Sequence, residues 1–526
     1  MHLFVQKYAP DVIGVLSGFD RLVFRGHIRQ LGYVDGLQCY LALHHLPTGA
    51  FKQHALELTA QLKEAVEAPV RRARRPIQYL PSTRIDKERL VHDIVARDRI
   101  RTGPIALLTC VEPCRTFELH SDREKKTIAL RPTYSRCTYF YKYAFHPQLG
   151  YYHARIQSWF PFNVQVNCNG REWLSRQLDR ARLRYRRADN TFVWLEDLAH
   201  AQRLLAHQLR TDWVRLLDGL VTELNPLHPA MFTPFRAPYY WSTYQVEWAS
   251  DVLFASPAAL RRLYGVLPRH AITTLSCRDI LRFLGALRPG KCGGEVHGKF
   301  SERDQGVRIK HSAAGNSLKV YDKAYAVRAG DWSVLRFENT VTNPAGYKAF
   351  RPREGDPDGP KSWLPLRKGV ADLHRLAEIA QAANDRYAAA MVACDSSASV
   401  AQTMLRLTLP VVLDGRRLRG LRPWAADDLA LLRAVNRGEY ALNGLRNRDL
   451  RAVLYPKPLA DAAEQRRRSA RVSRLLRLLR AHGLIRKVPK THRYQVTANG
   501  RTLLATVLTA VDTTVAQLAQ LPQLAA

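Results

Sequence analysis

The sequence has few of the features that mark secreted, membrane-spanning or nucleotide-hydrolysing proteins. Its 526 residues contain eight cysteines and no CxxC pair, which argues against a disulfide framework. It has no lipidation motif and no apolar run of the roughly 18 residues that a membrane-spanning helix needs. The stretch GKCGGE at 290–295 lacks the GxxxxGK[ST] order of a P-loop. The N-terminal MHLFVQKYAPDV lacks the regions of a signal peptide, so we expect a cytoplasmic protein with no membrane partner.

The cysteines are expected to be reduced and mostly buried thiols. Cys110 and Cys114 form the one close pair, and no second pair completes a zinc site. The alternative is a zinc cluster of Cys110, Cys114 and Cys137 with His120 or His153.

Acidic residues are scarce relative to basic ones. The chain has 81 Lys and Arg against 46 Asp and Glu, a formal net charge of +35. Such an excess repels itself unless a polyanion neutralises it, and nucleic acid is the commonest such partner. We therefore expect DNA as the partner, with RNA as the alternative. The basic residues form clusters along the whole chain, as an extended nucleic-acid path would require: 71–75, 180–187, 416–422, 446–451 and 466–480.

The length predicts two to four domains. We predict an α+β fold, in which a mixed α/β body with small antiparallel sheets precedes a C-terminal winged helix-turn-helix domain. The predicted divisions are an N-terminal α/β segment at 1–100, a central α+β body at 101–350, a linker and long helix at 351–410, and the winged helix-turn-helix domain at 411–526. The sequence is compatible with a dimer.

Residues 307–343 contain the most informative pattern in the body. Three short strands are predicted at 307–310, 317–321 and 333–341, joined by Gly-Asn and Gly-Asp turns. Period-two alternation gives this small sheet an apolar face and a polar face. The polar face carries Lys310, Lys319, Tyr321, Arg336 and Glu338. Cations hold phosphates and a carboxylate can hold a metal, so this face suits work on a phosphodiester. The alternative is a half-exposed sheet with a solvated polar face.

Two further stretches supply candidate carboxylates. Residues 12–28 predict two strands around a Ser-Gly turn, with Asp20 at the edge of the second, where metal-dependent nucleases often place a ligand. A turn residue or helix cap is the alternative for Asp20. Residues 239–254 predict a helix on which Glu247 and Asp251 share a face. A cation or metal between them would relieve their repulsion, and a solvated face is the alternative.

Aromatic residues interleaved with cations fill residues 136–162. This composition is typical of a base-stacking surface, and also of an aromatic-rich hairpin core, which we favour. The turn at 147–150 predicts the hairpin.

The C-terminal third predicts helices at 427–436, 447–455 and 467–482, strands at 484–488 and 494–497, and a last helix from Gly500. This order is that of a winged helix-turn-helix. The basic third helix is predicted to face the major groove or its phosphates through Ser469, Arg471, Ser473, Arg474, Arg477 and Arg480. The wing is predicted to meet the DNA backbone through Lys487, Lys490, His492 and Arg493. The alternative is a winged helix used only for protein contacts.

Three resemblances accompany these patterns. LLRLLRAHGLIRKVPKTHRYQVTANGR resembles MarR-like winged helices, which implies DNA binding. Most of the chain is similar to an uncharacterised group of bacterial proteins, through Phe19-Asp20-Arg21, Trp159-Phe160-Pro161-Phe162, Lys310-His311 and Val320-Tyr321-Asp322-Lys323.

Tyr321-Asp322-Lys323 followed by Leu335-Arg336-Phe337-Glu338 is similar to the YDK and RxE strands of rolling-circle replication initiators. The resemblance implies a tyrosine that attacks DNA beside a metal held by acidic residues. The chain lacks the His-hydrophobic-His motif of those proteins.

Together these features predict a nucleic-acid-binding protein of a bacterial mobile or replication element. If it is an enzyme, it is a phosphodiester-cleaving nuclease, transposase-like or Rep-like. Its catalytic residues are then Tyr321, Asp20 and Glu338. Tyr321 would be the nucleophile, or carboxylates would gather Mg²⁺. The predicted Mg²⁺ ligands are Asp20, Asp322, Glu338 and Glu247, and Lys310, Lys319 and Arg336 are expected to contact nucleic acid. The alternatives are a non-enzymatic winged-helix transcriptional regulator and a protein partner of a structured RNA.

Overall fold

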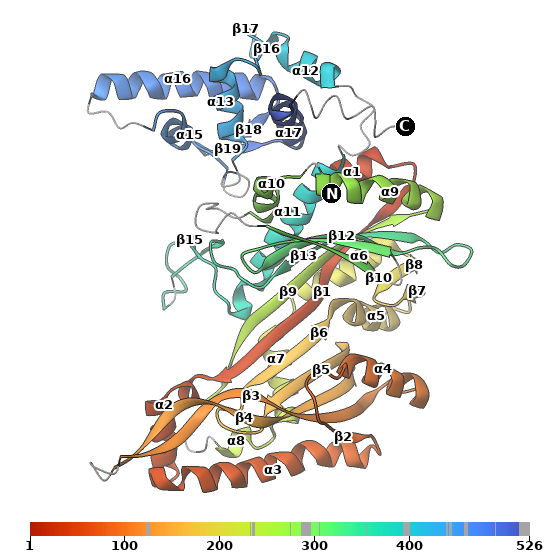
Figure 1. Ribbon diagram of the computed structural model, residues 1–526, viewed down its shortest axis with the longest axis vertical. Coiled ribbons are helices and arrows are strands. Elements are labelled where there is room, and N and C mark those ends of the chain that lie inside the picture. Colours follow the sequence, from red (N-terminus) through yellow and green to blue (C-terminus); the bar gives the residue numbers. More distant parts are fainter. Residues whose placement is uncertain are drawn as a thin grey trace.

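The computed structural model describes residues 1–122, 127–231, 233, 237–273, 275–285, 296–303, 306–353, 355–392, 400–437, 440, 444–456, 461–489 and 491–514. The molecule is elongated, with its body built on a large sheet and its last helices gathered at one end (Figure 1). The prediction of a mixed chain of helices and strands is confirmed.

An 11-stranded sheet forms the body, in the order β10-β11-β12-β13-β9-β1-β6-β5-β4-β3-β2. Its strands are β1 (Val12–Ile28), β2 (Ile77–Leu80), β3 (Gly103–Asp122), β4 (Thr127–His146), β5 (Gly150–Gln157), β6 (Val164–Asn169), β9 (Tyr239–Phe254), β10 (His297–Arg303), β11 (Gly306–Ala313), β12 (Asn316–Ala324) and β13 (Ser333–Val341). Neighbouring strands are antiparallel except β2 and β3, which are parallel. The sequence predicted only small sheets in the body. The large one arises because β1 and β9 pair along nearly their whole lengths and join the strands on either side.

Residues 12–28 form one continuous strand, so the predicted Ser-Gly turn is wrong. Ser17 and Gly18 pair with Ser250 and Ala249 of β9. A Cβ atom on Gly18 would lie 2.5 Å from the Leu205 side chain. This glycine therefore permits close packing of a helix on the strand and does not turn the chain.

Residues 239–254 form strand β9, so the helix predicted there is wrong as well. β9 lies between β1 and β13, and all its residues from 246 to 254 are buried. A strand buried on both faces shows no period-two alternation of polar and apolar residues. Glu247 and Asp251 nevertheless share a face, because side chains four positions apart in a strand point the same way.

The three strands predicted between residues 307 and 341 are confirmed as β11, β12 and β13, and the hairpin around residues 147–150 is confirmed as β4 and β5. The aromatic stretch in and after this hairpin is mostly core, since Tyr143, Phe160 and Phe162 are almost completely buried.

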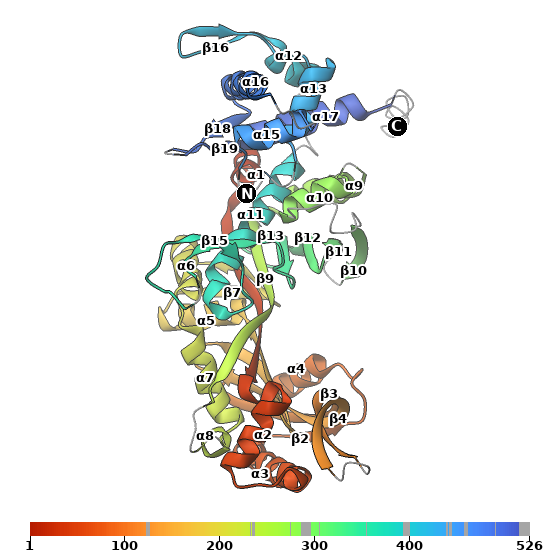
Figure 2. The ribbon, with the colours of Figure 1, turned by 90° about the vertical axis from the view of Figure 1, so that its left-hand side faces the viewer.

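Helices cover both faces of the sheet. They are α1 (His2–Lys7), α2 (Val34–Leu43), α3 (Phe51–Arg72), α4 (Lys87–Asp98), α5 (Gly170–Arg180), α6 (Leu198–Ala206), α7 (Trp213–Leu224), α8 (His228–Met231), α9 (Pro257–Thr273), α10 (Cys277–Leu284) and α11 (Leu373–Met391). Figure 2 shows α5, α6 and α7 on the opposite side of the sheet from α4.

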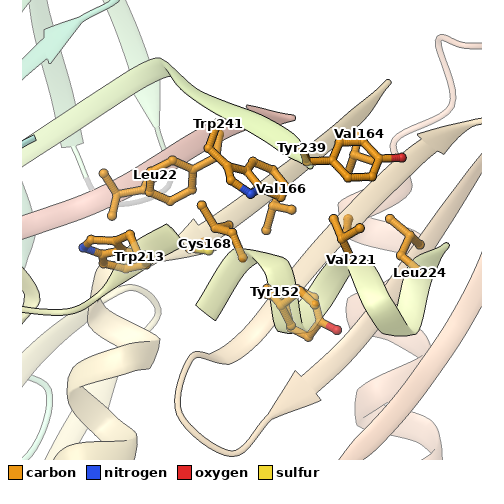
Figure 3. Packing of buried hydrophobic residues seen from close by; sticks show 14 of the residues in the cluster. Leu22, Tyr152, Val164, Val166, Cys168, Trp213, Val221, Leu224, Tyr239 and Trp241 are labelled. Atoms are coloured by element: carbon orange, nitrogen blue, oxygen red, sulfur yellow. The ribbon is translucent and has the colours of Figure 1, made fainter. Parts of the chain in front are cut away.

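The main core lies between the sheet and helices that include α7. Figure 3 shows Trp213, Val221 and Leu224 of α7 facing side chains of β1, β5, β6 and β9. A second core packs α9, α10 and α11 against β12 and β13. A third lies under α4, where Val91 and Ile94 contact strand residues that include Tyr141 and Tyr143. Together these cores hold the central strands in place from both sides.

The C-terminal elements share a hydrophobic core of their own, which includes Leu431, Leu450, Leu476 and Leu504. They are α12 (Val400–Thr408), α13 (Ala426–Val435), α15 (Asn447–Leu454), α16 (Ala462–Ala481), β18 (Ile485–Lys487), β19 (Tyr494–Val496) and α17 (Ala498–Asp512). The predicted helices and strands of this region are therefore present in the predicted order.

Shorter strand pairs complete the fold: β7 (Tyr185–Ala188) with β8 (Thr191–Leu195), β14 (Lys348–Arg351) with β15 (Ser362–Pro365), and β16 (Val411–Leu413) with β17 (Arg416–Leu418). Across the described ranges, no helix has both the length and the apolar character to traverse a bilayer.

Candidate functional site

Three buried carboxylates meet on the central strands of the sheet. Asp20 of β1, Glu247 of β9 and Glu338 of β13 each place one oxygen within 4.8 Å of the other two. Because β9 lies between β1 and β13, three adjacent strands contribute one acid each. We call these residues the acidic cluster. Three of the four predicted metal ligands are thus brought together.

A β-bulge places Asp20 in the acidic cluster. The pairing of β1 with β9 shifts register between Phe19 and Arg21, which makes Asp20 the extra residue. Bulges of this kind re-aim a side chain and are common beside functional sites. The first residue of α5, Gly170, packs directly on this bulge, since a Cβ there would lie 1.8 Å from the carbonyl oxygen of Phe19.

Two buried arginines hold Asp20 together with Asp251. Arg336 donates to Asp20 at 2.9 Å and to both oxygens of Asp251 at 2.5 and 2.9 Å. Arg171 donates to Asp251 at 3.0 Å. Burial alone would raise the pKa of Asp251, but the two guanidinium groups outweigh it and lower that pKa. Asp251 is therefore a charged anchor for Arg336, and Arg336 fixes the orientation of Asp20.

Lys319 and Tyr321 of β12 contact Glu338 directly. The Lys319 ammonium donates to one oxygen of Glu338 and lies 3.6 Å from Glu247. The Tyr321 hydroxyl donates to the other oxygen of Glu338 at 2.9 Å. The alternation predicted for β12 and β13 is therefore confirmed. The alternative of a half-exposed sheet is wrong, because every residue of both strands is buried.

The two glutamates of the acidic cluster differ in proton affinity. Burial acts to raise the pKa of Glu338, but Lys319 and Arg336 outweigh it and the net pKa is lowered. Burial and the charge of Glu338 raise the pKa of Glu247. Burial and Glu338 also raise the pKa of Tyr321 well above its ordinary value, which keeps the phenol protonated.

The acidic cluster is buried, and the exposed side chain of Arg21 lies at its edge. The Arg21 guanidinium lies 3.9 Å from Glu247, and its side chain is 60% exposed, whereas that of Glu247 is 9% exposed. The nearby Glu247 carboxylate is the main cause that raises the pKa of Arg21. Arg21 therefore forms an ion pair that links the buried Glu247 to the surface.

The donor set of the acidic cluster fits a small hard cation. Mg²⁺ prefers oxygen ligands in an octahedron of radius about 2.1 Å, which separates opposite ligands by about 4.2 Å. The 4.8 Å limit on the three oxygens is close to that span. Because the Lys319 ammonium now neutralises Glu338 and approaches Glu247, a bound cation would displace it.

The remaining predicted residues of this region make no hydrogen bond or ion pair to the acidic cluster that is seen in the described residues. Lys310 of β11 pairs with Lys319 across the strands and is half-buried. Asp322 follows Tyr321 in β12 and does not converge with the three acids. Burial raises the pKa of Asp322 to about 6. No three cysteine and histidine side chains converge among the residues that the structure describes, so the zinc alternative gains no support there.

A second feature lies further along β1, where a cavity of about 640 Å³ opens between strands β1, β3, β4, β5 and β6. Its lining includes Arg25, Arg115 and Arg155 together with Tyr134 and Tyr139. The Arg155 guanidinium lies 5.0 Å from the centre of the Tyr139 ring, and Tyr134 is 81% exposed. Cations beside accessible aromatic rings are typical of surfaces that bind single-stranded nucleic acid. We call this cavity the basic cleft.

The predicted contact residues of the C-terminal region fall into two groups. On α16, Arg474 and Arg477 are exposed, and Arg471 is exposed with Asp427 3.3 Å away. The side chains of Ser469 and Ser473 instead hydrogen-bond Asn447 of α15, at 3.2 and 2.8 Å. Among the other predicted residues, Lys487 and His492 are exposed, and Arg480 and Arg493 are half-buried. Lys490 lies outside the described residues.

Sequence reasoning missed Arg171 and Asn190. It also assigned Arg336 to nucleic acid, although the buried Arg336 donates to Asp20 and Asp251. Arg171 follows a strand and opens a helix, and its sequence context resembles any capped helix start. Asn190, whose amide donates to Asp20 at 2.9 Å, lies in the β7–β8 turn. One signal in the sequence could have indicated these partners. Arg336 lies inside a strand, and a cation that is buried in a sheet needs acidic residues around it.

Comparisons with protein-family models, with curated proteins and with solved structures found no match to this chain.

Proposed function

We propose that the protein binds nucleic acid and cleaves a phosphodiester bond with Mg²⁺ held by the acidic cluster. The convergence of Asp20, Glu247 and Glu338 from three adjacent strands carries this proposal. A net charge of +35 makes a polyanion the natural partner. A cation is needed because three carboxylates by themselves would repel a phosphate.

Each neighbour of the acidic cluster then has a distinct role. Mg²⁺ would supply Lewis-acid activation of the phosphate and of a water nucleophile. Arg336 orients Asp20 and Tyr321 orients Glu338, through the hydrogen bonds described above. Lys319, once displaced from Glu338, supplies an ammonium group beside the scissile phosphate. Tyr321 is a positioning residue in this proposal, because a buried phenol of raised pKa is a poor nucleophile.

The basic cleft offers a path for a nucleic-acid strand to reach the acidic cluster. Arg21 and Arg25 lie on the same strand as Asp20, and Arg25 is exposed and stacks on the Tyr244 ring at 3.4 Å. Five residues of strand span roughly 16 Å, so the cleft and the cluster are a few nucleotides apart. Phosphates would contact the arginines and bases would stack on Tyr134 and Tyr139.

The C-terminal helices and hairpin would anchor duplex DNA next to this path. The order α13, α15, α16, β18, β19, α17 supports a winged helix-turn-helix. Arg474 and Arg477 would contact the groove or its phosphates from α16, and Lys487 would contact the backbone from the hairpin.

The test uses labelled supercoiled plasmid, duplex DNA, single-stranded DNA and structured RNA, each with Mg²⁺ or with EDTA. We expect Mg²⁺-dependent cleavage of DNA that is lost in Glu338→Gln and Asp20→Asn, while binding in EDTA is retained. Glu118→Gln, at an exposed position of β3, is the matched control and should cleave normally. Cleavage that persists in both cluster variants would refute the assignment.

One observation favours a second function, a non-enzymatic DNA-binding regulator. Lys319 and Arg336 already neutralise Glu338 and Asp20, so the acidic cluster could serve as a buried ion-pair network alone. Sequence-specific duplex binding without cleavage in any metal would identify this function, whereas shape-specific binding of structured RNA would identify an RNA partner.

A further inference from the structure

Five arginine side chains line a small cavity where the C-terminal elements meet the body. The cavity has a volume of about 230 Å³. Its arginines come from elements far apart in the sequence: Arg282 of α10, Arg386 of α11, Arg437 after α13, Arg486 of β18 and Arg501 of α17. Figure 1 shows α10 and α11 directly below these C-terminal elements. The cavity thus belongs to both parts of the molecule.

The arginines on the body side are almost completely buried. Arg282 is 7% exposed and Arg386 is 6% exposed. Arg386 donates twice to the carbonyl oxygen of Phe283, at 2.6 and 3.0 Å. Arg282 contacts Asn436 and Asp279 through its two terminal nitrogens. The Nε atoms of Arg282 and of Arg501 are buried without a hydrogen-bond partner among the described residues.

Within the described ranges, the acids that act on Arg282, Arg386 and Arg501 are Asp279 and Asp385. Asp385 is the acid in the cavity lining, and the N-terminal ammonium at 3.2 Å and the amide of Gln381 at 2.8 Å already engage it. Burial and the neighbouring Arg282 lower the pKa of Arg501, and burial lowers the pKa of Arg386 to about 10. Positive side chains that crowd around one cavity repel one another, and an anion bound between them would relieve this repulsion.

Guanidinium forks match the oxygens of phosphate, with which they make paired hydrogen bonds. We propose that this cavity binds a phosphate-bearing anion, which ties the C-terminal elements to the body. The phosphate can come from a free phosphate compound or from the backbone of bound nucleic acid. The proposal does not depend on the acidic cluster or on cleavage.

The test measures thermal unfolding of the full chain in pyrophosphate, inorganic phosphate and chloride at matched ionic strength. We expect pyrophosphate to raise the melting temperature above the chloride value and phosphate to do so less strongly. Arg437→Ala and Arg486→Ala, at exposed positions of the lining, should each weaken pyrophosphate binding at least tenfold by calorimetry. Arg501→Gln should do so as well, and circular dichroism will show whether this half-buried substitution leaves the fold intact.

Arg215→Ala, at an exposed position of α7 outside the cavity, removes the same charge and should bind pyrophosphate like the unmodified chain. Duplex DNA that displaces labelled pyrophosphate would identify the nucleic-acid backbone as the source of the phosphate, and lack of competition would identify a free compound. An equal effect of pyrophosphate and chloride on the unmodified chain, or normal binding by both Arg437→Ala and Arg486→Ala, would overturn the proposal.

Discussion

The Lys319 ammonium is hydrogen-bonded to Glu338 and lies 3.6 Å from Glu247, between two carboxylates that belong to different strands. A lysine at this position does what a divalent cation bound in the acidic cluster would do. The positive charge of Lys319 reduces the repulsion between the two buried carboxylates. The relationship predicts competition between the ammonium group and a metal ion.

The first prediction tests this competition with Lys319→Met. In EDTA the variant should lose about 3–5 kcal/mol of unfolding free energy, because two buried carboxylates are left without their cation. Mg²⁺ should restore more of the free energy of unfolding in the variant than it adds to the unmodified chain, since no ammonium competes. Urea unfolding with and without Mg²⁺ measures both effects.

The matched control for that prediction is Lys142→Met. Lys142 is a buried lysine that pairs with Glu223 at 2.9 Å, away from the acidic cluster. This variant should lose stability but show no added response to Mg²⁺. An equal Mg²⁺ response in the two variants would contradict the displacement of Lys319 by metal.

The second prediction concerns Tyr321→Phe. The substitution removes the donor to Glu338 and should cost about 1.5–3 kcal/mol of stability, the range for a hydrogen bond to a charged group. DNA cleavage should persist at a reduced rate, and no covalent protein–DNA adduct should form in either protein. Denaturing gels of reactions with labelled DNA check this. An adduct that forms in the unmodified chain and vanishes in Tyr321→Phe would instead make the phenol the nucleophile.

The third prediction uses the raised pKa of Asp322. Folding moves the pKa of this carboxyl from 3.8 to about 6. Between pH 4 and pH 6 the native state therefore binds more protons than the unfolded chain, and Asp322 makes stability fall as the pH rises through that window. Asp322→Asn should match the unmodified chain near pH 4 and exceed its unfolding free energy by about 2–3 kcal/mol at pH 7.

Chemical unfolding at these two pH values measures the difference. The control is Asp358→Asn, at an exposed position, which should change neither value. A variant less stable than the unmodified chain at pH 7 would show that the hydrogen bond from Tyr325 to the Asp322 carboxylate outweighs the cost of its burial.

The sequence pattern predicted the polar face of β12 and β13, because the alternation of polar and apolar residues in a strand can be seen in consecutive residues. It placed Lys319 and Glu338 on one face of the sheet, and the pairing of β12 with β13 sets them opposite each other. The same reasoning failed for β9, because residues buried on both faces of a sheet lose the period of two, and apolar residues then also fit helical spacing. Glu247 was predicted as a metal ligand because it would share a helix face with Asp251, whereas both residues lie in a strand.

The convergence of the three acids could not be predicted from local sequence patterns, for a different reason. Asp20 of β1 and Glu338 of β13 lie close together because only β9 stands between their two strands in the sheet. This strand order is set by pairing between segments that are far apart in the sequence. The bulge that turns Asp20 inward depends on its register against β9 and on the fit of Gly170 against Phe19. Neither contact can be predicted from the residues that neighbour Asp20 in the sequence.

The last prediction concerns the exposed arginines of α16. Arg474→Ala and Arg477→Ala should each weaken duplex DNA binding. The double variant should also reduce the slope of log affinity against log salt by about 2, because each arginine that neutralises a phosphate releases counterions. Fluorescence anisotropy over a salt series measures affinity and slope together. Arg215→Ala carries the same loss of charge on α7 and should leave the slope unchanged.

The double variant also separates the two proposed nucleic-acid contacts. If α16 anchors the duplex while the basic cleft holds a single strand, the double variant should keep its affinity for single-stranded DNA, and Arg25→Ala should lose it. A parallel loss for both substrates in both variants would mean that one continuous surface binds every form of DNA. Unchanged duplex affinity in the double variant would remove α16 from the interface, since its exposed cations would then contact no phosphate.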